Sequence, residues 1–499
     1  MTTDLLIGLD LGTSAIKGVL VSSAGELLAR ERCATCLERP AEGRVEFSAA
    51  GYLEGVCEVL RALAGAAPAG ANVRALSMAA ASGNTVLLDE DGEPLGQALS
   101  WMDQRARGDS TLLPELDGAS VHEVVGWPWG GGFPLAHLAW LRKHEPDSWG
   151  RAATFAMNVT YVLRSLSGRT AIDPSTGTTF YLQDQVGDCW HRPFLAALGI
   201  EECALPERGR SGEVLGPLTA EAAERTGLTE ETLVVLGAFD HPCAARGTGV
   251  LTPGDMLLSC GTSWVAFYPI SERGAGLANK MLVDPFLSPA GPWGAMFSLP
   301  RIGAAVDAYI DGLLLDSTED RASAARYETF NREARGAPAG ANGLTLDLSA
   351  RPVPEPAYIE RVRREHAPSD IGRAIMESVA FALWQRLLQL AAAGVDARGI
   401  TMVGGPTESS VWPQIVADVT GLTLRLTGGQ HAGALGAAVL AGMGAGIFAD
   451  EHEGAAAMAG EASEITPDPA THAEYKRLLG EMALNARRPS GPGSSLRST

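Results

Sequence analysis

The sequence predicts an α/β protein made of two duplicated domains, and two observations lead to this prediction. In the first half of the chain, apolar runs typical of strands alternate with segments of helical spacing. In addition, an apolar strand, the tripeptide Gly-Thr-Ser and a second apolar strand occur together twice, with the tripeptide at residues 12–14 and 261–263. Because the two copies lie about half a chain length apart, duplication explains them better than chance.

The first half is expected to open with a β-hairpin. Residues 4–10 and 16–21 are apolar runs joined by a Gly/Thr/Ser turn, which is the pattern of paired antiparallel strands. Hydrophobic spacing predicts the further elements in order: a strand near 27–30, a helix over 52–67, strands over 73–78 and 85–88, and helices over 135–143 and 159–166.

The second half is expected to open with a matching hairpin. Its predicted elements are strands over 255–260 and 264–267, a long buried helix over 371–393, a strand over 401–403 and a helix over 412–419. Ser409 or Ser410 is the expected N-cap of that last helix, and Pro413 falls in its first turn. Residues 426–449 lack charge but are rich in glycine, which indicates a turn and a packed helix rather than a membrane span.

A cluster of glycine and proline between residues 237 and 254 marks the expected domain boundary. We therefore predict an N-terminal domain over 1–246 and a C-terminal domain over 247–485. Residues 486–499 have too little apolar content to fold, so we expect a disordered tail there.

Charge and cysteine content exclude several classes of protein. The chain has 39 Lys and Arg against 59 Asp and Glu, a net charge of -20, which repels nucleic-acid phosphates and argues against a nucleic-acid partner. Seven cysteines, an odd number in a long chain, do not form a secreted disulfide framework, and Cys33 and Cys36 have no second pair for a zinc site. The N-terminus has no basic segment typical of a signal peptide, so we expect a cytoplasmic protein without a membrane partner.

The first hairpin turn, Asp10-Leu11-Gly12-Thr13-Ser14, has the residue types of a phosphate cradle. A tight turn exposes main-chain N–H groups, glycine permits close approach and hydroxyl groups add donors. The carboxylate of Asp10 can hold Mg²⁺ directly or through water, and Lys17 can return across the hairpin toward phosphate. An ordinary hairpin with a surface aspartate is the alternative, since short glycine patterns recur by chance.

The second Gly-Thr-Ser turn strengthens the phosphate hypothesis, because two such hairpins can grip a nucleotide from both sides of an interdomain cleft. Gly404 and Gly405 follow a predicted strand and lead into a helix, which is where α/β sheets place ligands. A plain strand–helix connection is the alternative for that pair of glycines.

Five motifs in this order resemble the FGGY family of carbohydrate kinases, which includes xylulose, ribulose and glycerol kinases. The motifs are Asp10-Leu11-Gly12-Thr13-Ser14, Trp101-x-Asp103-x-Arg105, Gly237-Ala238-Phe239-Asp240, Gly261-Thr262-Ser263 and Gly404-Gly405-x-x-Glu408-x-x-x-Trp412. The resemblance implies two ribonuclease H-like domains, as in actin and hexokinase, with ATP and Mg²⁺ in the interdomain cleft.

The resemblance also implies residue roles for the nucleotide. Asp10 is expected to organise Mg²⁺ through water. The expected contacts of ATP are Gly12, Thr13, Ser14 and Lys17 on the N-terminal side, Gly261, Thr262 and Ser263 on the C-terminal side, and Gly303, Gly404, Gly405 and Glu408 around the nucleotide.

Asp240 matches the catalytic base of the family. A carboxylate with the usual Asp pKa of ~3.9 is a weak base, but it suffices where the proton leaves late and the carboxylate also aligns the attacking oxygen. A helix-capping aspartate is the alternative, since Pro242 follows two residues later.

The expected substrate contacts are Ser82, Asn84, Trp101, Asp103, Arg105, Asp240 and His241. Asp103 and Arg105 suit hydrogen bonding to a polyhydroxylated chain, or form a salt bridge beside a core tryptophan. His241 either contacts the substrate or packs at the domain junction. The loop 81–84 departs from the known subfamilies, and so does the tract 343–356, so the sugar stays unidentified.

Together these features predict an ATP-dependent kinase that phosphorylates a hydroxyl of a small sugar, either a ketose such as a pentulose or a polyol. A conformational ATPase of the actin or heat-shock type is one alternative, and a regulatory sugar-binding pseudokinase is another. The pattern leaves a homodimer open as the assembly.

Overall fold

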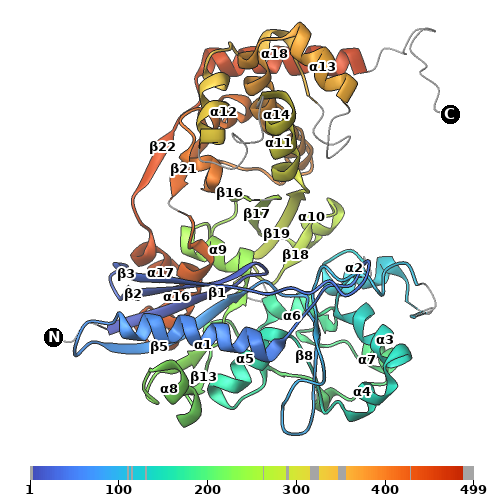
Figure 1. The fold of residues 1–499 in the computed structure, drawn as a ribbon, viewed down its shortest axis with the longest axis vertical. Helices are drawn as coiled ribbons and strands as arrows, with labels where there is room; N and C mark the ends of the chain where they lie inside the picture. Colours follow the sequence, from blue (N-terminus) through green and yellow to red (C-terminus); the bar gives the residue numbers. More distant parts are fainter. Residues whose placement is uncertain are drawn as a thin grey trace. The chain divides into compact units, whose positions relative to one another are not determined.

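The structure is a computed structural model that describes residues 4–109, 112–113, 116–129, 132–261, 263–287, 291–314, 325–346, 356–427 and 429–486. Thr262 and the tail residues 487–499 lie outside the described residues, so the predictions made for them are not addressed. The chain forms two compact units (Figure 1). Unit 1 comprises Met1–Leu257, Phe267–Phe297 and Gly428–Glu461, and unit 2 comprises Leu258–Ala266, Ser298–Thr427 and Ala462–Thr499.

In the part of the chain that the structure describes, unit 1 contains a mixed seven-stranded β-sheet. Its strands are β13 (Val214–Pro217), β14 (Leu233–Val235), β5 (Asn72–Ala80), β1 (Asp4–Leu11), β2 (Ala15–Ser22) and β3 (Leu27–Ala34) in this spatial order, with β15 (Ala238–Phe239) also paired to β5. The pairs β1–β2 and β2–β3 are antiparallel, whereas β5 lies parallel to both β1 and β14. The predicted hairpin is therefore confirmed, and each strand runs slightly longer than expected.

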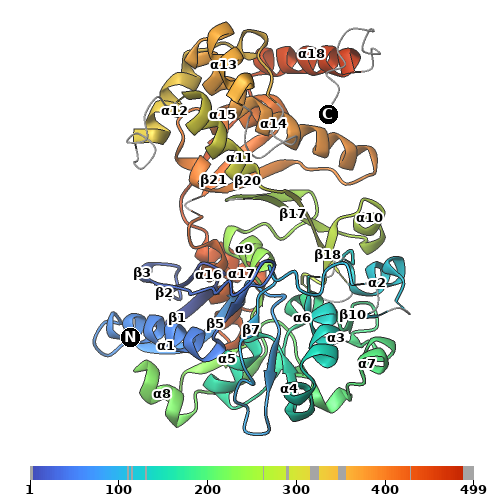
Figure 2. The same ribbon diagram turned by 45° about the vertical axis from the view of Figure 1, so that its right-hand side comes forward.

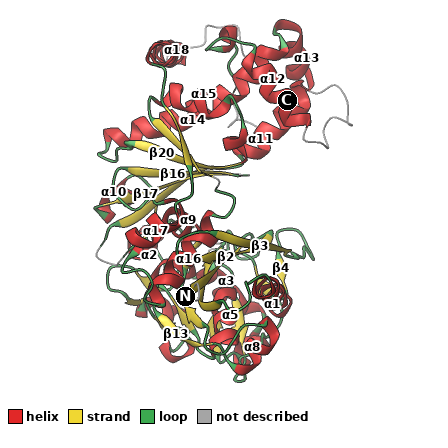
Figure 3. Ribbon diagram, turned by 90° about the vertical axis from the view of Figure 1, so that its left-hand side faces the viewer, coloured by secondary structure: helices red, strands yellow, loops and turns green. Residues whose placement is uncertain are grey.

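Helices cover the two faces of this sheet, as Figure 3 shows for α1 (Ala49–Gly65) and α16 (Ala432–Gly444). A Cβ added at Gly18 would lie 2.7 Å from Leu63 of α1, whereas one at Gly8 would lie 1.8 Å from the carbonyl oxygen of Ala434 in α16. Helix α9 (Asp240–Thr248) packs equally closely on α16, where a Cβ at Gly436 would lie 1.7 Å from the main-chain oxygen of Cys243. The glycines thus let main chains touch, and the packed helix expected within 426–449 is confirmed.

Apart from strands that belong to a second sheet, the rest of unit 1 contains short helices (Figure 2) and two-stranded ladders. The helices are α2 (Gly118–Val125), α3 (Pro134–His144), α4 (Pro146–Arg151), α5 (Asn158–Ser167), α6 (Pro174–Phe180), α7 (Arg192–Leu198), α8 (Ala220–Thr226), α10 (Arg273–Ala278) and α17 (Glu451–Met458). The ladders pair β4 (Glu46–Phe47) with β7 (Ala98–Leu99), β6 (Val86–Leu88) with β8 (Thr154–Ala156), β9 (Ala171–Ile172) with β12 (Glu207–Arg208), and β10 (Gln183–Asp184) with β11 (Cys189–Trp190).

A second seven-stranded sheet contains the other predicted hairpin. Its order is β18 (Leu282–Asp284), β19 (Trp293–Leu299), β17 (Trp264–Ile270), β16 (Asp255–Cys260), β20 (Gly399–Gly404), β21 (Thr423–Thr427) and β22 (Ala462–Ile465). The series β3-β2-β1-β5-β14 of the first sheet thus corresponds to β19-β17-β16-β20-β21 of the second. In each series the first three strands are the hairpin and the strand beside it, and the last two strands are parallel to each other. These parallel pairs are β5 with β14 in the first sheet and β20 with β21 in the second.

The described helices of unit 2 are α11 (Ile302–Tyr309), α12 (Ala325–Arg335), α13 (Pro356–Glu365), α14 (Pro368–Ala392), α15 (Trp412–Thr420) and α18 (Pro469–Ala486), with a π-helical turn over Ile310–Leu314. Two of them, α14 and α15, confirm the helices predicted over 371–393 and 412–419, and the other described helices were not predicted. The hydroxyl of Ser409 accepts hydrogen bonds from the N–H groups of Val411 and Trp412. The N-cap of α15 is nevertheless Val411, so the prediction of Ser409 or Ser410 at that position is wrong, whereas Pro413 lies in the first turn as expected. No described helix combines the length and apolarity that crossing a bilayer requires.

Candidate active site

The turn between β1 and β2 has the geometry of a tight hairpin. The N–H of Gly12 donates to the carbonyl oxygens of Asp10 (3.0 Å) and Ala15 (3.1 Å), and a Cβ at Gly12 would lie 2.7 Å from that Ala15 oxygen. Any side chain at this position would therefore have to displace the main chain. Ser14 is exposed at the tip of the turn. The hairpin register pairs Asp10 with Lys17, whose Nζ lies 3.5 Å from Oδ2 of Asp10.

Asp10 lies among charged groups that bear on its ionisation. Burial raises the pKa of Asp10 to about 6, and the charge of Asp240 adds to this rise, while Lys17 and His241 act in the opposite direction. The start of α16 is close as well, since a Cβ at Gly433 would lie 3.3 Å from Cγ of Asp10. Asp10, Lys17, Asp240 and His241 thus share one electrostatic neighbourhood on unit 1.

Asp240 is the first residue of α9 and directly follows β15, which pairs with β5. Its Oδ1 accepts a hydrogen bond of 2.7 Å from the N–H of His241, so the carboxylate makes a local contact at the helix start, as in the capping alternative. The ring of His241 packs edge-on against Phe239, with the centroids 5.6 Å apart. The helix start therefore holds the Asp240 carboxylate in the neighbourhood of Asp10.

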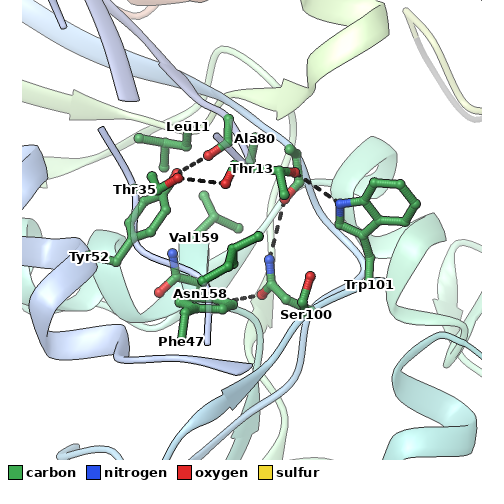
Figure 4. A pocket seen from close by; sticks show the side chains of 14 residues that line it. Leu11, Thr13, Thr35, Phe47, Tyr52, Ala80, Ser100, Trp101, Asn158 and Val159 are labelled. Carbon is green, nitrogen blue, oxygen red and sulfur yellow. Dashed lines mark hydrogen bonds between the residues drawn. The ribbon is translucent and has the colours of Figure 1, made fainter. Parts of the chain in front are cut away.

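Trp101 is joined to the turn between β1 and β2 by a direct contact. Its side chain is 43% exposed, and its indole N–H donates to Oγ1 of Thr13 at 2.9 Å (Figure 4). The hydroxyl of Tyr52 donates to the carbonyl oxygen of Gly12 at 3.0 Å, and that of Thr35 donates to the carbonyl oxygen of Thr13. Three side chains from separate segments thus hold the turn and line a cavity beside it.

Ser82 and Asn84 are buried, and their polar atoms bind the protein itself. The hydroxyl of Ser82 donates to the carbonyl oxygen of Ala80 at 3.0 Å. The amide of Asn84 donates to the carbonyl oxygen of Ala81 and accepts from the N–H of Asn158 at 2.6 Å. In this arrangement the two side chains shape the loop that precedes β6.

Asp103 and Arg105 form a buried ion pair. The carboxylate of Asp103, which is 0% exposed, accepts from the N–H of Val45 (2.7 Å) and from the N–H and guanidinium of Arg105. The guanidinium of Arg105 also binds Glu46 and lies over the ring of Trp140, with Cζ 5.1 Å from its centroid. Although burial raises it, hydrogen bonds from Arg105 and Val45 bring the pKa of Asp103 below its usual value.

The residues expected to contact the nucleotide from the C-terminal side lie on unit 2. The N–H of Arg301, just before α11, donates to the hydroxyl of Ser263 at 3.2 Å, which brings the start of α11 and Gly303 to the second hairpin turn. Gly261 closes that turn through a hydrogen bond from its N–H to the carbonyl oxygen of Ser263 (3.3 Å).

Gly404 and Gly405 also lie beside this hairpin. Gly404 has φ +102°, and a Cβ there would lie 2.4 Å from the carbonyl oxygen of Cys260, whereas one at Gly405 would have no neighbour within 4 Å. Glu408 ends the 3₁₀ turn Gly405–Glu408 that follows, and the helix expected over 412–419 starts at Trp412 as predicted. Three segments of unit 2 therefore meet at one place.

Several neighbours of these residues were not singled out from the sequence. Tyr52 and Thr35 support the first turn, and an aromatic group of Trp127, Phe133, Tyr181 and Phe239 packs next to His241. The aromatic residues are scattered over more than 100 positions, so no local pattern indicates their contact. Of the described residues, no three His, Cys, Asp or Glu side chains gather as ligands of a metal ion.

Family models match both halves of the chain. The N-terminal domain of the FGGY family of carbohydrate kinases matches residues 5–247, and the C-terminal domain of that family matches residues 256–445. The chain belongs to the FGGY family of carbohydrate kinases. The resemblance to this family that the five sequence motifs indicated is therefore confirmed. Kinases of this family use ATP as the phosphate donor.

Curated relatives and solved structures agree with this membership. The chain is 27% identical to the xylulose kinase of Bacillus subtilis over 494 residues, covering 95% of each protein, and 28% identical to the autoinducer-2 kinase of Salmonella paratyphi A over 497 residues, covering 95% of this chain and 92% of that one. The crystal structure of xylulose kinase from Rhodospirillum rubrum matches with a TM-score of 0.82 at 25% identity, covering 97% of this chain and 98% of that one. The predicted fold class, two duplicated ribonuclease H-like α/β domains, is thereby confirmed, and this FGGY protein is a carbohydrate kinase.

Proposed function

We propose that this FGGY kinase transfers the terminal phosphoryl group of ATP to a hydroxyl of a ketose such as a pentulose, or of a polyol, with Asp240 as general base. The observation that carries the proposal is the shared neighbourhood of Asp240, Asp10 and Lys17 on unit 1. The names of the relatives, xylulose kinase and autoinducer-2 kinase, support a small sugar-like acceptor.

Asp240 is proposed to accept the proton of the attacking hydroxyl and to align its oxygen. Phosphoryl transfer has a loose transition state, so positioning and charge neutralisation matter more than a strong base. The helix start that binds the Asp240 carboxylate through the N–H of His241 restricts its rotation, which favours the aligning role.

Asp10 fits the role of holding Mg²⁺, directly or through water. Its carboxylate is 19% exposed, and burial together with the negative Asp240 raises its pKa, so an added cation would stabilise its charged form. Mg²⁺ bound with ATP supplies neutralisation of the charge on the phosphoryl oxygens. Lys17 adds a second positive charge, and the hydroxyl groups of Thr13 and Ser14 can donate to phosphate, whereas the N–H of Gly12 is used inside the turn.

On unit 2, the proposed nucleotide contacts come from the segments that meet around the second hairpin. They are Gly261, Thr262 and Ser263 for phosphate and Gly303, Gly404, Gly405 and Glu408 for the nucleoside. The open space at Gly405, where an added Cβ would meet nothing within 4 Å, supports a ligand contact there.

On the acceptor side, Trp101 and His241 are the proposed direct contacts, since the half-exposed Trp101 donates to Thr13 of the turn and His241 follows Asp240 and acts on the charge of Asp10. Ser82, Asn84, Asp103 and Arg105 remain proposed as part of the substrate site. Their protein hydrogen bonds support a positioning role for these four side chains. The oxygens of Ser82, Asn84 and Asp103 can accept a further hydrogen bond from a substrate hydroxyl, whereas Arg105 can only donate.

The test is a coupled ADP-release assay with D-xylulose, D-ribulose, D-gluconate and glycerol as acceptors. Wild-type ATP consumption should rise sharply with at least one of them. Asp240→Asn should lower kcat by ~10²–10⁴-fold, the usual contribution of a general base, with ATP affinity within about twofold. The exposed Asp91→Asn serves as the matched control and should leave kcat unchanged. Full turnover in Asp240→Asn, or ATP hydrolysis that no sugar stimulates, would contradict the proposal.

A further inference from the structure

A buried serine and aspartate lie directly behind the residue that precedes Asp240. The hydroxyl of Ser175, in α6, donates to Oδ2 of Asp284 at 2.9 Å and accepts from the N–H of Phe239 at 3.2 Å. Ser175 and Asp284 are both 0% exposed. The hydroxyl is therefore used once as donor and once as acceptor, which fixes its orientation.

Three elements far apart in the sequence supply these groups. Ser175 lies in the first turn of α6, which Asp173 caps by accepting from the N–H of Thr176 at 2.9 Å. Asp284 ends β18, and Phe239 ends β15, whose next residue is Asp240. The pair thus joins the scaffold of unit 1 to the main chain at the start of α9.

The surroundings of Asp284 favour its neutral form. Burial raises the pKa of Asp284 to about 8, Asp173 and Asp240 add to this rise, and Ser175 and Arg246 oppose it. Arg246 is engaged elsewhere, with hydrogen bonds to the carbonyl oxygens of Phe286 (2.7 Å) and Pro242 (3.3 Å). Among the described residues, the second oxygen of Asp284, Oδ1, has no hydrogen-bond partner.

A neutral acid here has a physical advantage. It accepts the Ser175 hydrogen bond without placing a second negative charge beside Asp240, whose carboxylate has to approach an alcohol and a polyanionic donor. A negatively charged group in the same buried place would repel the Asp240 carboxylate and the polyanionic phosphoryl donor.

We propose that Ser175 and Asp284 are positioning residues for phosphoryl transfer, holding the peptide at Phe239 so that the Asp240 carboxylate faces the acceptor hydroxyl. The inference rests on the proposed role of Asp240. Neither residue touches the reacting atoms. Both act through the main chain, where a shift of about 1 Å at a reacting group costs ~10²-fold in rate.

The first experiment needs no sugar. Hydrogen exchange of the full-length protein, followed by mass spectrometry of peptides that span residues 236–243, reports on the Phe239 amide. Ser175→Ala should increase exchange there at least several-fold, because the N–H loses its acceptor. The control Thr179→Val removes a hydroxyl from the same buried helix, which among the described residues donates to the carbonyl oxygen of Thr176 and the sulfur of Met157, and should leave this peptide unchanged.

The second experiment measures kcat with D-xylulose and the affinity for ATP by calorimetry. Ser175→Ala and Asp284→Leu should each lower kcat by ~10–10²-fold with ATP affinity within about twofold, as expected for a misplaced base. Asp284→Asn keeps the shape, an acceptor for Ser175 and neutrality, so its kcat should stay within about threefold of wild type. Asp284→Leu removes the acceptor from the other side, so the inference is tested even if Ser175→Ala does not fold.

The outcomes separate this inference from the proposed function. If Asp240→Asn abolishes turnover while Ser175→Ala and Asp284→Leu do not alter kcat or exchange, only the positioning role is overturned. If Asp240→Asn keeps full turnover, the base and its positioning residues are overturned together. Equal losses of kcat in Asp284→Asn and Asp284→Leu would also contradict the proposal, because the neutral acceptor would then have no effect.

Discussion

Replacing Asp103 with alanine separates a structural role of this residue from direct substrate binding. The change removes the acceptor of the Val45 N–H, which lies 2.7 Å from Oδ2, and of the main-chain and guanidinium N–H groups of Arg105. The guanidinium, 3% exposed, is left with Glu46 alone as its carboxylate partner. Removing one member of a buried ion pair costs about 3–5 kcal/mol, so we expect the free energy of unfolding to fall by that amount.

The assay is equilibrium unfolding in urea at pH 7.5, with the KM for the sugar measured on the same preparations. The control is Glu207→Ala, which breaks a pair with Arg169 in which the glutamate is 60% exposed, and such surface pairs contribute no more than about 1 kcal/mol. The pKa of Asp103 is lowered in the folded protein, so its contribution is present above the unfolded value of ~3.9 and is lost as the pH falls through the folded value.

The refuting result is specific. If Asp103→Ala unfolds within about 1 kcal/mol of wild type and instead raises the KM for the sugar more than about tenfold, the carboxylate binds substrate and the ion pair contributes little.

Three further predictions concern packing, capping and pH. Gly436→Ala should destabilise unit 1 by about 3 kcal/mol or more in urea unfolding, because its Cβ would overlap the main-chain oxygen of Cys243; unchanged stability would contradict the close packing of α9 on α16. Ser409→Ala should cost about 1 kcal/mol, since the N–H groups of Val411, which precedes α15, and of Trp412, its first residue, lose their acceptor, whereas Ser410→Ala should cost less. Burial raises the pKa of Asp173 to about 6 and of Asp284 to about 8, and unfolded aspartate titrates near ~3.9. Their stabilisation is therefore fully present below pH ~4 and lost as the pH rises toward 8, and Asp284→Asn should flatten the upper part of this slope in unfolding titrations from pH 4 to 9.

Contacts between residues close in sequence were largely predictable. Antiparallel pairing across a short turn places Lys17 opposite Asp10, and the Gly-Thr-Ser pattern is enough to expect that pairing. The start of α15 followed in the same way from Pro413 in its first turn, although the N-cap is Val411, and Ser409, which lies two residues upstream of it, accepts the hydrogen bonds there. In each case the interaction depends on a few neighbouring residues and on standard backbone geometry.

Burial of polar residues was not predictable in this way. The pattern Trp101-x-Asp103-x-Arg105 is compatible with a sugar site and with a surface salt bridge, and the structure instead shows a buried pair beside Glu46 and Trp140. The same residues at the same spacing would occur in a sugar site, a surface salt bridge or a buried ion pair. The sequence pattern cannot distinguish these cases, because the exposure of the pair depends on which other segments pack against it.

By itself, the sequence determined that this is an α/β protein with a repeated hairpin, and its motifs identified the FGGY family and the acidic residues at the candidate site. Local periodicity and turn chemistry suffice for that. Only the tertiary structure decided that Trp101 binds Thr13, that the start of α16 lies beside Asp10, and that Ser175 and Asp284 stand behind Asp240. These contacts join residues about 60 to more than 400 positions apart, so they arise from the packing of whole elements, which no local pattern encodes.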